Sequence, residues 1–300
     1  MQKIEKIVNT LILGHKNLSD KTLSFCEEIV DRRGMAVVKV NSKEQSYALK
    51  FSLPEGVEVY DPFKIIKHEG EILKQAGEIA DNLYVDQGEL NGVTWLLTKW
   101  IDGQNLYQWA EPLRKEYSEK NIATFLKIFI EICRKIEKIN SAGFIHGDLQ
   151  PVHFFLTHNN VITLIDWALV KNINNNSCEL DYKGGLVHYV SPEVAVQMLG
   201  KKDNILLDEI SEVYSLATVL FTLYTGKTST FYGSDNLKSI SFEDKLKRVS
   251  EGNHNSFSKL NIPAFPNLEK LFCYALQVDR KKRCSSVKQF REELEQIYNK

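Results

Sequence analysis

The sequence lacks several features that would indicate a location or a partner. Its five cysteines, an odd number, form no CxxC pair, which excludes a simple disulfide framework and favours reduced thiols. It contains no signal peptide and no run of about 18 apolar residues, so we expect no membrane span. The net charge is −1, so no global basic field indicates nucleic acid as a partner. We therefore expect a cytoplasmic protein.

The first third of the chain is rich in strand-like patterns. With 300 residues, 43% of them hydrophobic, the chain is long enough to bury a full core. Two short β-branched runs, 35–40 and 46–51, flank a polar turn and predict a hairpin, and 63–75 has helical spacing. Segments 83–85 and 93–100 predict a second strand pair around the Asn91-Gly92 turn.

After Gly103 the pattern becomes helical. Apolar residues recur at three- and four-residue spacing over 122–139, and 213–224 is an apolar run long enough for a buried helix. Segments 268–278 and 286–298 are amphipathic. A β-rich part followed by a helical part predicts an α+β chain with segregated lobes.

The densest chemical signal lies in residues 144–168, FIHGDLQPVHFFLTHNNVITLIDWA. Two short apolar strands are each bounded by an acid: Asp148 precedes the first and Asp166 follows the second. Two carboxylates at the ends of one hairpin suit phosphoryl transfer, in which one orients the attacking hydroxyl and the other holds Mg²⁺ on the phosphates.

HGDLQPVH resembles the catalytic loop of the protein-kinase superfamily, and IDWA resembles its metal-binding segment. The resemblance implies Asp148 as catalytic base and Asp166 as a Mg²⁺ or Mn²⁺ ligand. It places His153, as a candidate metal ligand, where the family usually has a second, metal-binding Asn. A His in place of this Asn resembles the lipopolysaccharide core heptose kinases. YALK then supplies Lys50, which contacts the ATP phosphates, and KHEGEIL supplies its partner, Glu69, with Glu71 as the weaker candidate.

The resemblance also implies how ATP is bound. LLTKWIDGQNL resembles the segment that contacts adenine, with Thr98 as gatekeeper. The nucleotide-contacting residues it implies, besides Lys50, are Val38, Ala48, Thr98, Lys99, Trp100, Ile101 and Leu156. The implied fold has a β-rich N-lobe over 1–101, with a five-stranded sheet and one helix, and a mainly helical C-lobe over 102–300.

Three later segments extend the resemblance in the family's order. Ser191-Pro192-Glu193 resembles the end of an activation segment, SEVYSLATVLFTLYTGK resembles the buried helix after it, and DRKKRCS supplies Arg283 as the partner of Glu193. Glu212 stands in place of that helix's usual Asp. Such an order over most of the chain is a specific signal.

Departures from the family pattern are concentrated at the phosphates and the substrate. None of the three glycines of the phosphate-covering loop is in place over 31–38, where Arg32 or Arg33 is expected to supply charge. Gly147 replaces the Arg that reads activation-loop phosphorylation, so we expect no such control. Gln150 and Leu186 replace residues typical of Ser/Thr kinases.

We therefore expect an ATP-dependent phosphotransferase with a hydroxyl acceptor, first of all protein Ser/Thr. The departures at residues 147, 150 and 153 leave a kinase of a sugar, glycolipid or other small molecule as an alternative. The lost glycines leave a pseudokinase scaffold as another, and AMP transfer as a variant reaction. Lys50, Glu69, Asp148 and Asp166 argue against the scaffold, because a pure scaffold has no chemical need for all four.

Overall fold

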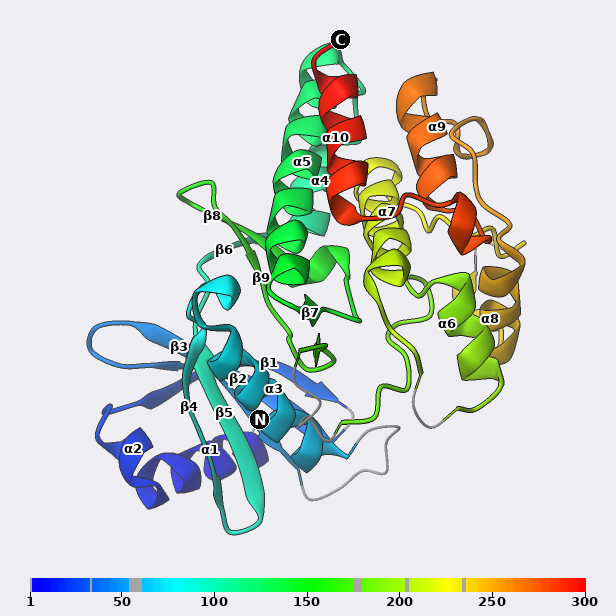
Figure 1. Ribbon diagram of the computed structural model, residues 1–300. Helices are drawn as coiled ribbons and strands as arrows, with labels where there is room; N and C mark the ends of the chain where they lie inside the picture. The colour runs from blue at the N-terminus through cyan, green and yellow to red at the C-terminus, as the bar shows by residue number, and fades with distance from the viewer. Residues whose placement is uncertain (1, 33, 54–60, 175–179, 203–204, 234–235) are drawn as a thin grey trace. The chain divides into compact units, whose positions relative to one another are not determined.

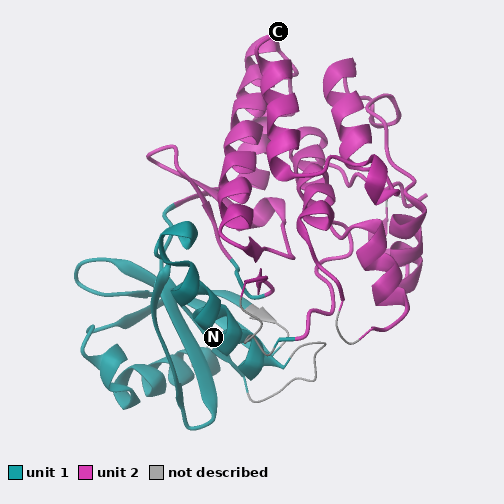
Figure 2. Ribbon diagram, viewed as in Figure 1, with its two compact units in different colours: residues 1–102, 166–168, 178–180 teal, residues 103–165, 169–177, 181–300 magenta. Residues whose placement is uncertain are grey.

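The computed structural model describes residues 2–32, 34–53, 61–174, 180–202, 205–233 and 236–300, and of Gln2, Asp31 and Arg32 the backbone alone. Arg32 and Arg33, expected to supply charge near the phosphates, therefore lie outside what is described of side chains. The chain forms two compact units: unit 1 comprises residues 1–102, 166–168 and 178–180, and unit 2 comprises 103–165, 169–177 and 181–300 (Figure 2).

Unit 1 is built on a five-stranded antiparallel sheet in the order β1-β2-β3-β5-β4 (Figure 1). The strands are β1 (Ser24–Arg32), β2 (Met35–Asn41), β3 (Ser46–Ser52), β4 (Tyr84–Leu90) and β5 (Val93–Lys99). Asn91 and Gly92, both at positive φ, form the tight turn between β4 and β5. The predicted hairpins are thus present, and β1 joins the first of them as an additional edge strand.

One face of this sheet is covered by the N-terminal helices α1 (Gln2–Gly14) and α2 (Lys16–Ser19). Ile4, Val8, Leu11 and Ile12 repeat at helical spacing and pack against the buried side chains of β2, β3 and β5. This cover was not predicted, because the apolar run at 8–13 is short and interrupted by polar residues. It seals the face of the sheet that carries Leu49 and Phe51.

The other face of the sheet receives α3 (Pro62–Ala76), which a 3₁₀ turn η1 (Gly77–Ala80) follows (Figure 1). Asp61 caps α3 by accepting the Phe63 amide, and Pro62 occupies its first turn. Ile65, Ile66 and Ile72 are buried toward the sheet. The capped start and the apolar stripe hold α3 in one rotation, which determines where Glu69 points.

Unit 2 is mainly helical. Its helices are α4 (Leu106–Leu113), α5 (Glu119–Ser141), α6 (Pro192–Leu199), α7 (Glu209–Thr225), α8 (Phe242–Glu251), α9 (Pro266–Ala275) and α10 (Val287–Tyr298), with 3₁₀ turns η2 (Pro151–His153), η3 (Leu237–Ser239), η4 (Ser258–Leu260) and η5 (Arg280–Lys282). Helices α5 and α10 lie side by side, and α7 is buried along nearly its whole length (Figure 1). The helices predicted from apolar spacing are therefore confirmed.

Short strands in unit 2 carry the loop that contains Asp148. They are β6 (Gly103–Asn105), β8 (Phe154–Thr157) and β9 (Ile162–Leu164) in one sheet, and β7 (Phe144–Ile145) with β10 (Lys171–Asn172) in another. Strand β7 and turn η2 bound the loop on either side. The α+β architecture expected from the sequence is confirmed. No described helix is long and apolar enough to cross a membrane.

Candidate active site

The first group of candidate residues is an ion cluster inside unit 1. The Lys50 ammonium lies 2.6 Å from Oε2 of Glu69 and 3.1 Å from Oδ1 of Asp166. Strand β3 presents Lys50 on the face covered by α3, and α3 presents Glu69 toward it. Glu71 is exposed instead and faces Lys67 at 4.0 Å, so Glu69 is the glutamate that contacts Lys50.

This cluster is buried enough for its charges to interact strongly. Burial by itself lowers the pKa of Lys50, but Asp166 and Glu69 outweigh burial, and the pKa is raised above its ordinary value. Lys50 is therefore a permanent cation at any physiological pH. With 18% of its side chain exposed, the ammonium is shielded from water and still accessible to a ligand.

The backbone after Asp166 belongs to the same cluster. The Trp167 amide donates to Oε1 of Glu69 at 3.2 Å, and Trp167 itself is fully buried. Asp166 lies in the left-handed region at φ +62, a conformation that Asp tolerates better than most residues. The segment therefore holds the Asp166 carboxylate in one orientation, with about a third of that side chain exposed.

A second group of candidate residues, inside unit 2, centres on Asp148. Its Oδ1 accepts the Leu186 amide at 3.0 Å, and its Oδ2 accepts the Gln150 side-chain amide at 2.8 Å. These two hydrogen bonds orient the Asp148 carboxylate. Gly185 permits this contact, because a Cβ there would lie 2.7 Å from Oδ1 of Asp148.

A buried glutamate on α7 holds the backbone of the Asp148 loop. Oε1 of Glu212 accepts the His146 amide at 2.5 Å and the Gly147 amide at 3.2 Å, and Oε2 accepts the Asn140 side chain. Burial raises the pKa of Glu212 to about 7, although these three hydrogen bonds pull it down. One side chain thus fixes two consecutive backbone positions immediately before Asp148.

A tyrosine joins the loop to the segment that follows β10. The Tyr182 hydroxyl donates to the Gly147 carbonyl at 2.7 Å, and the Ile205 amide donates to the Tyr182 carbonyl. Gly147 lies at φ +75, and a Cβ there would meet the Leu169 carbonyl at 2.9 Å. The position where the family carries an arginine therefore has neither the room nor the backbone for one.

Comparisons with known proteins point to the same family as these two groups of residues. The family model described as "Protein kinase domain" matches residues 34–296. The chain belongs to the protein kinase family.

Several curated bacterial kinases resemble the chain. It is 26% identical over 202 residues to "Serine/threonine-protein kinase PknD" of Chlamydia felis, covering 62% of this chain and 20% of that protein. It is 29% identical over 202 residues to PknD of Chlamydia muridarum (62% and 21%) and 25% identical over 208 residues to "Probable serine/threonine-protein kinase PknB" of Lactococcus lactis (68% and 30%). The chain thus spans between a fifth and a third of the length of these kinases.

One expected nucleotide contact of this kinase does not fit the sheet. Lys50 pairs with Val37 across the β2–β3 ladder, whereas Val38 pairs with Leu49. Directly paired residues share a face and successive residues alternate, so Val38 points away from Lys50. Val38 is fully buried against α1 and α2. The valine on the Lys50 face is Val37, which is one residue before the valine that the family resemblance implied.

The remaining expected contacts are divided between the units. Ala48 pairs with Thr98, and both share the face of Lys50. Leu156 lies in β8 of unit 2. Their contact with a nucleotide stays a prediction.

The segment expected to contact adenine has already used two of its amides. The Lys99 amide donates to Leu83, and the Trp100 amide donates to Ser46. The Lys39 ammonium covers the Trp100 ring, 4.6 Å from its centroid. Within the described part of this segment, the Ile101 amide makes no backbone hydrogen bond, and its contact with adenine stays a prediction.

His153 is positioned by the loop itself. It is 6% exposed, and its Nδ1 lies 3.1 Å from the Asp148 carbonyl. Because a carbonyl only accepts, Nδ1 is the donor in this hydrogen bond. The same bond also supports the loop without any metal, so the ligand role of His153 stays a prediction.

The predicted pairing of Glu193 with Arg283 is confirmed. Nη1 and Nη2 of Arg283 donate to the two Glu193 oxygens at 2.8 and 3.0 Å, and the Arg283 side chain is fully buried. Arg283 also donates to the Ile210 and Gln277 carbonyls. Sequence reasoning missed Tyr182 and Asn140, which have no motif of their own. The Gly184-Gly185 pair was the available signal for the close approach to Asp148.

Proposed function

We propose that this chain transfers the γ-phosphate of ATP to serine or threonine hydroxyls of proteins. The observation that carries the proposal is the cluster of Lys50, Glu69 and Asp166, because it places a fixed cation beside a carboxylate suited to a metal–phosphate complex. The relatives, whose names describe serine/threonine-protein kinases, support a protein acceptor over a small molecule.

Each unit supplies part of the chemistry. In unit 1, Lys50 binds phosphate oxygens of ATP, and Glu69 keeps the ammonium in place. In unit 2, Asp148 accepts a hydrogen bond from the acceptor hydroxyl. The hydroxyl oxygen bonds to the γ-phosphorus while the bond to the β–γ bridging oxygen breaks. ADP leaves with that electron pair, and the proton passes to the Asp148 carboxylate.

The residues fit a divalent cation of the Mg²⁺ type. Asp166 offers a partly exposed carboxylate, the oxygen donor that Mg²⁺ prefers. No group of three His, Cys, Asp or Glu side chains that could hold a metal occurs among the described residues. Phosphate oxygens of ATP therefore have to complete the coordination, as is usual for Mg²⁺ in kinases. The bound cation would neutralise the charge that develops on the phosphates.

The test is phosphate transfer by the purified chain. We expect Asp148→Asn to abolish transfer from γ-labelled ATP to itself and to serine or threonine peptides, with phosphosites mapped by mass spectrometry. Asp20→Asn is the matched control, since Asp20 is exposed at the end of α2. Transfer that is equal in Asp148→Asn and wild type would refute the assignment.

Two other outcomes would favour the alternatives. A flat thermal-shift response to ATP and Mg²⁺ would indicate a scaffold, since a nucleotide at a hundred times its Kd stabilises a fold by about 2.7 kcal/mol. ATP consumption stimulated by sugars, and not by peptides, would indicate a small-molecule kinase.

A further inference from the structure

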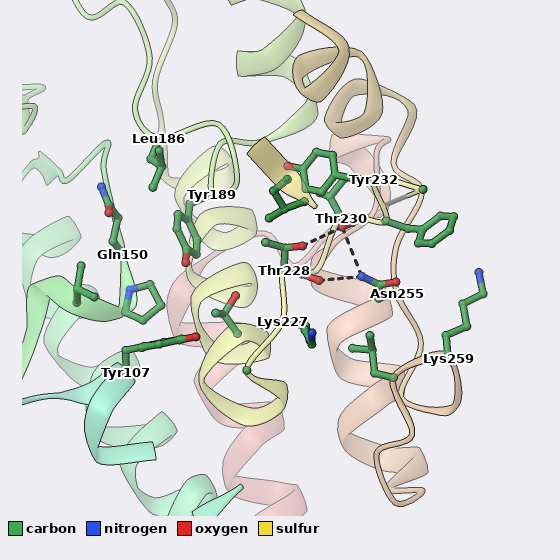
Figure 3. A pocket seen from close by; sticks show the side chains of 18 residues that line it. Tyr107, Gln150, Leu186, Tyr189, Lys227, Thr228, Thr230, Tyr232, Asn255 and Lys259 are labelled. Carbon is green, nitrogen blue, oxygen red and sulfur yellow. Dashed lines mark hydrogen bonds between the residues drawn. The ribbon is translucent and has the colours of Figure 1, made fainter. Parts of the chain in front are cut away.

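Unit 2 contains a cavity of about 770 Å³ beside the Asp148 loop (Figure 3). Its walls come from α4, the 150–152 turn, the 186–189 segment, the end of α7, the 226–233 loop and the 255–260 segment. Tyr107 and Tyr189 extend into the space between α4 and the 255–260 segment (Figure 3).

The cavity adjoins the catalytic carboxylate. Two of its lining residues, Gln150 and Leu186, are the two that donate hydrogen bonds to Asp148. Anything bound in the cavity therefore lies one side chain away from the group that orients the acceptor hydroxyl. This position suits recognition of the substrate rather than of a distant regulator.

The far wall of the cavity is rigid. The side-chain amide of Asn255 donates to the carbonyls of Thr228 and Thr230 at 3.0 and 3.4 Å (Figure 3). The Phe231 amide donates to Asn253, and the Asn255 amide donates to Ser229. Two loops are thus joined before any ligand arrives, which lowers the entropy cost of binding.

The charge of the cavity has one sign. Lys227 and Lys259 line it, and no described aspartate or glutamate does. The Lys259 ammonium lies 5.2 Å from the centre of the Phe231 ring, a cation–π contact that holds it at the wall. Lys227 follows the end of α7, where its backbone is bonded to Thr225. The cavity therefore attracts an anionic group.

Its rim favours a polypeptide as the source of that group. Tyr107, Val152 and Phe231 line the cavity and are 39%, 43% and 44% exposed. Large apolar side chains left exposed together beside a cavity are typical of protein interaction sites. A peptide can cover them while an acidic side chain reaches the lysines.

We propose that the cavity binds an acidic residue of the acceptor protein, so that Lys227 and Lys259 select serines or threonines within acidic segments. This inference rests on the proposed function, and it names the class of acceptor. The lysines act on the binding of the acceptor and take no part in the transfer itself.

The experiment uses serine peptides in which glutamate, alanine or lysine is placed at each position on either side of the acceptor. We expect wild type to favour glutamate in at least one position by about fivefold in kcat/KM, the upper range of one exposed ion pair. The difference should lie in KM. Lys227→Glu and Lys259→Glu should reverse the preference toward lysine peptides. Lys127→Glu, on the exposed side of α5, is the matched control.

The outcomes separate this inference from the proposed function. Peptide transfer with no charge preference, or a preference that both reversals leave intact, overturns the inference and leaves the function standing. Transfer to phosphorylated sugars that depends on the same lysines overturns the assignment to a peptide. Absence of transfer to any peptide or protein overturns both. Equal thermal midpoints of the variants and wild type show that the reversals did not unfold the chain.

Discussion

Gly147 is the position where the structure makes the sharpest quantitative prediction. In Gly147→Ala, the new Cβ has to occupy a residue at φ +75 and lies 2.9 Å from the Leu169 carbonyl and from Cδ2 of Leu207. The left-handed backbone costs about 1–2 kcal/mol for a residue with a side chain. Overpacking against a backbone atom costs about 1–3 kcal/mol more. We therefore expect a loss of about 2–5 kcal/mol in the free energy of unfolding.

The matched control is Gly233→Ala. Gly233 also lies in unit 2, at φ +76, but none of the described residues has an atom within 4 Å of the place its new Cβ would take. The control therefore carries the backbone cost and no steric cost. The difference between the two variants, measured by urea unfolding with equal m-values, isolates the contact at Gly147.

Activity provides a second measurement. Gly147 precedes Asp148, and its carbonyl accepts the Tyr182 hydroxyl, so a backbone shift at Gly147 moves the carboxylate that we propose as the catalytic base. A displacement of about 1 Å lowers kcat by roughly a hundredfold. If Gly147→Ala unfolded within about 0.5 kcal/mol of Gly233→Ala and retained its kcat, the crowding described around this loop would be wrong.

Three further predictions follow from single contacts. Tyr182→Phe removes the hydroxyl that donates to Gly147, and it should cost about 1 kcal/mol of unfolding free energy. The same change should lower kcat and leave KM for ATP unchanged. Urea unfolding measures the first effect and steady-state kinetics the second, and a loss of ATP affinity alone would contradict the prediction. Burial raises the pKa of Glu212 to about 7, so the contribution of Glu212 to stability is largest below about pH 4.5 and is lost as the pH rises to about 7. Glu212→Gln should remove up to about 3 kcal/mol of this pH dependence between pH 4.5 and 8, and an unchanged slope would exclude the assigned titration. Lys50→Met leaves two carboxylates without their cation and should lower the free energy of unfolding by about 3–5 kcal/mol. Adding Glu69→Gln should restore stability but not phosphate transfer. A double variant that regained transfer would refute the role of Lys50.

Local patterns determined most of the secondary structure. The Asn91-Gly92 turn and the alternation in β3 identified hairpins, because both depend on neighbouring residues alone. The long apolar repeat of α5 identified a helix for the same reason. Motif order then identified the kinase family, and with it the contact of Lys50 with Glu69.

Errors arose where a result depended on register or on distant segments. Val38 and Val37 are adjacent in sequence and equal in chemistry, and only the pairing of β2 with β3 decides which of them faces Lys50. The cover formed by α1 was missed because its apolar stripe is short, and its stability comes from the sheet beneath it.

The sequence by itself therefore determined the family, the α+β architecture and the carboxylates to which catalysis is assigned, since motifs and periodicity are local properties. Tertiary structure alone decided what holds those carboxylates. Asp148 is oriented by a backbone amide 38 residues away, and Gly147 accepts a hydroxyl from 35 residues away. A backbone donor or acceptor has no side-chain signature, so such contacts become visible only when the chain is folded.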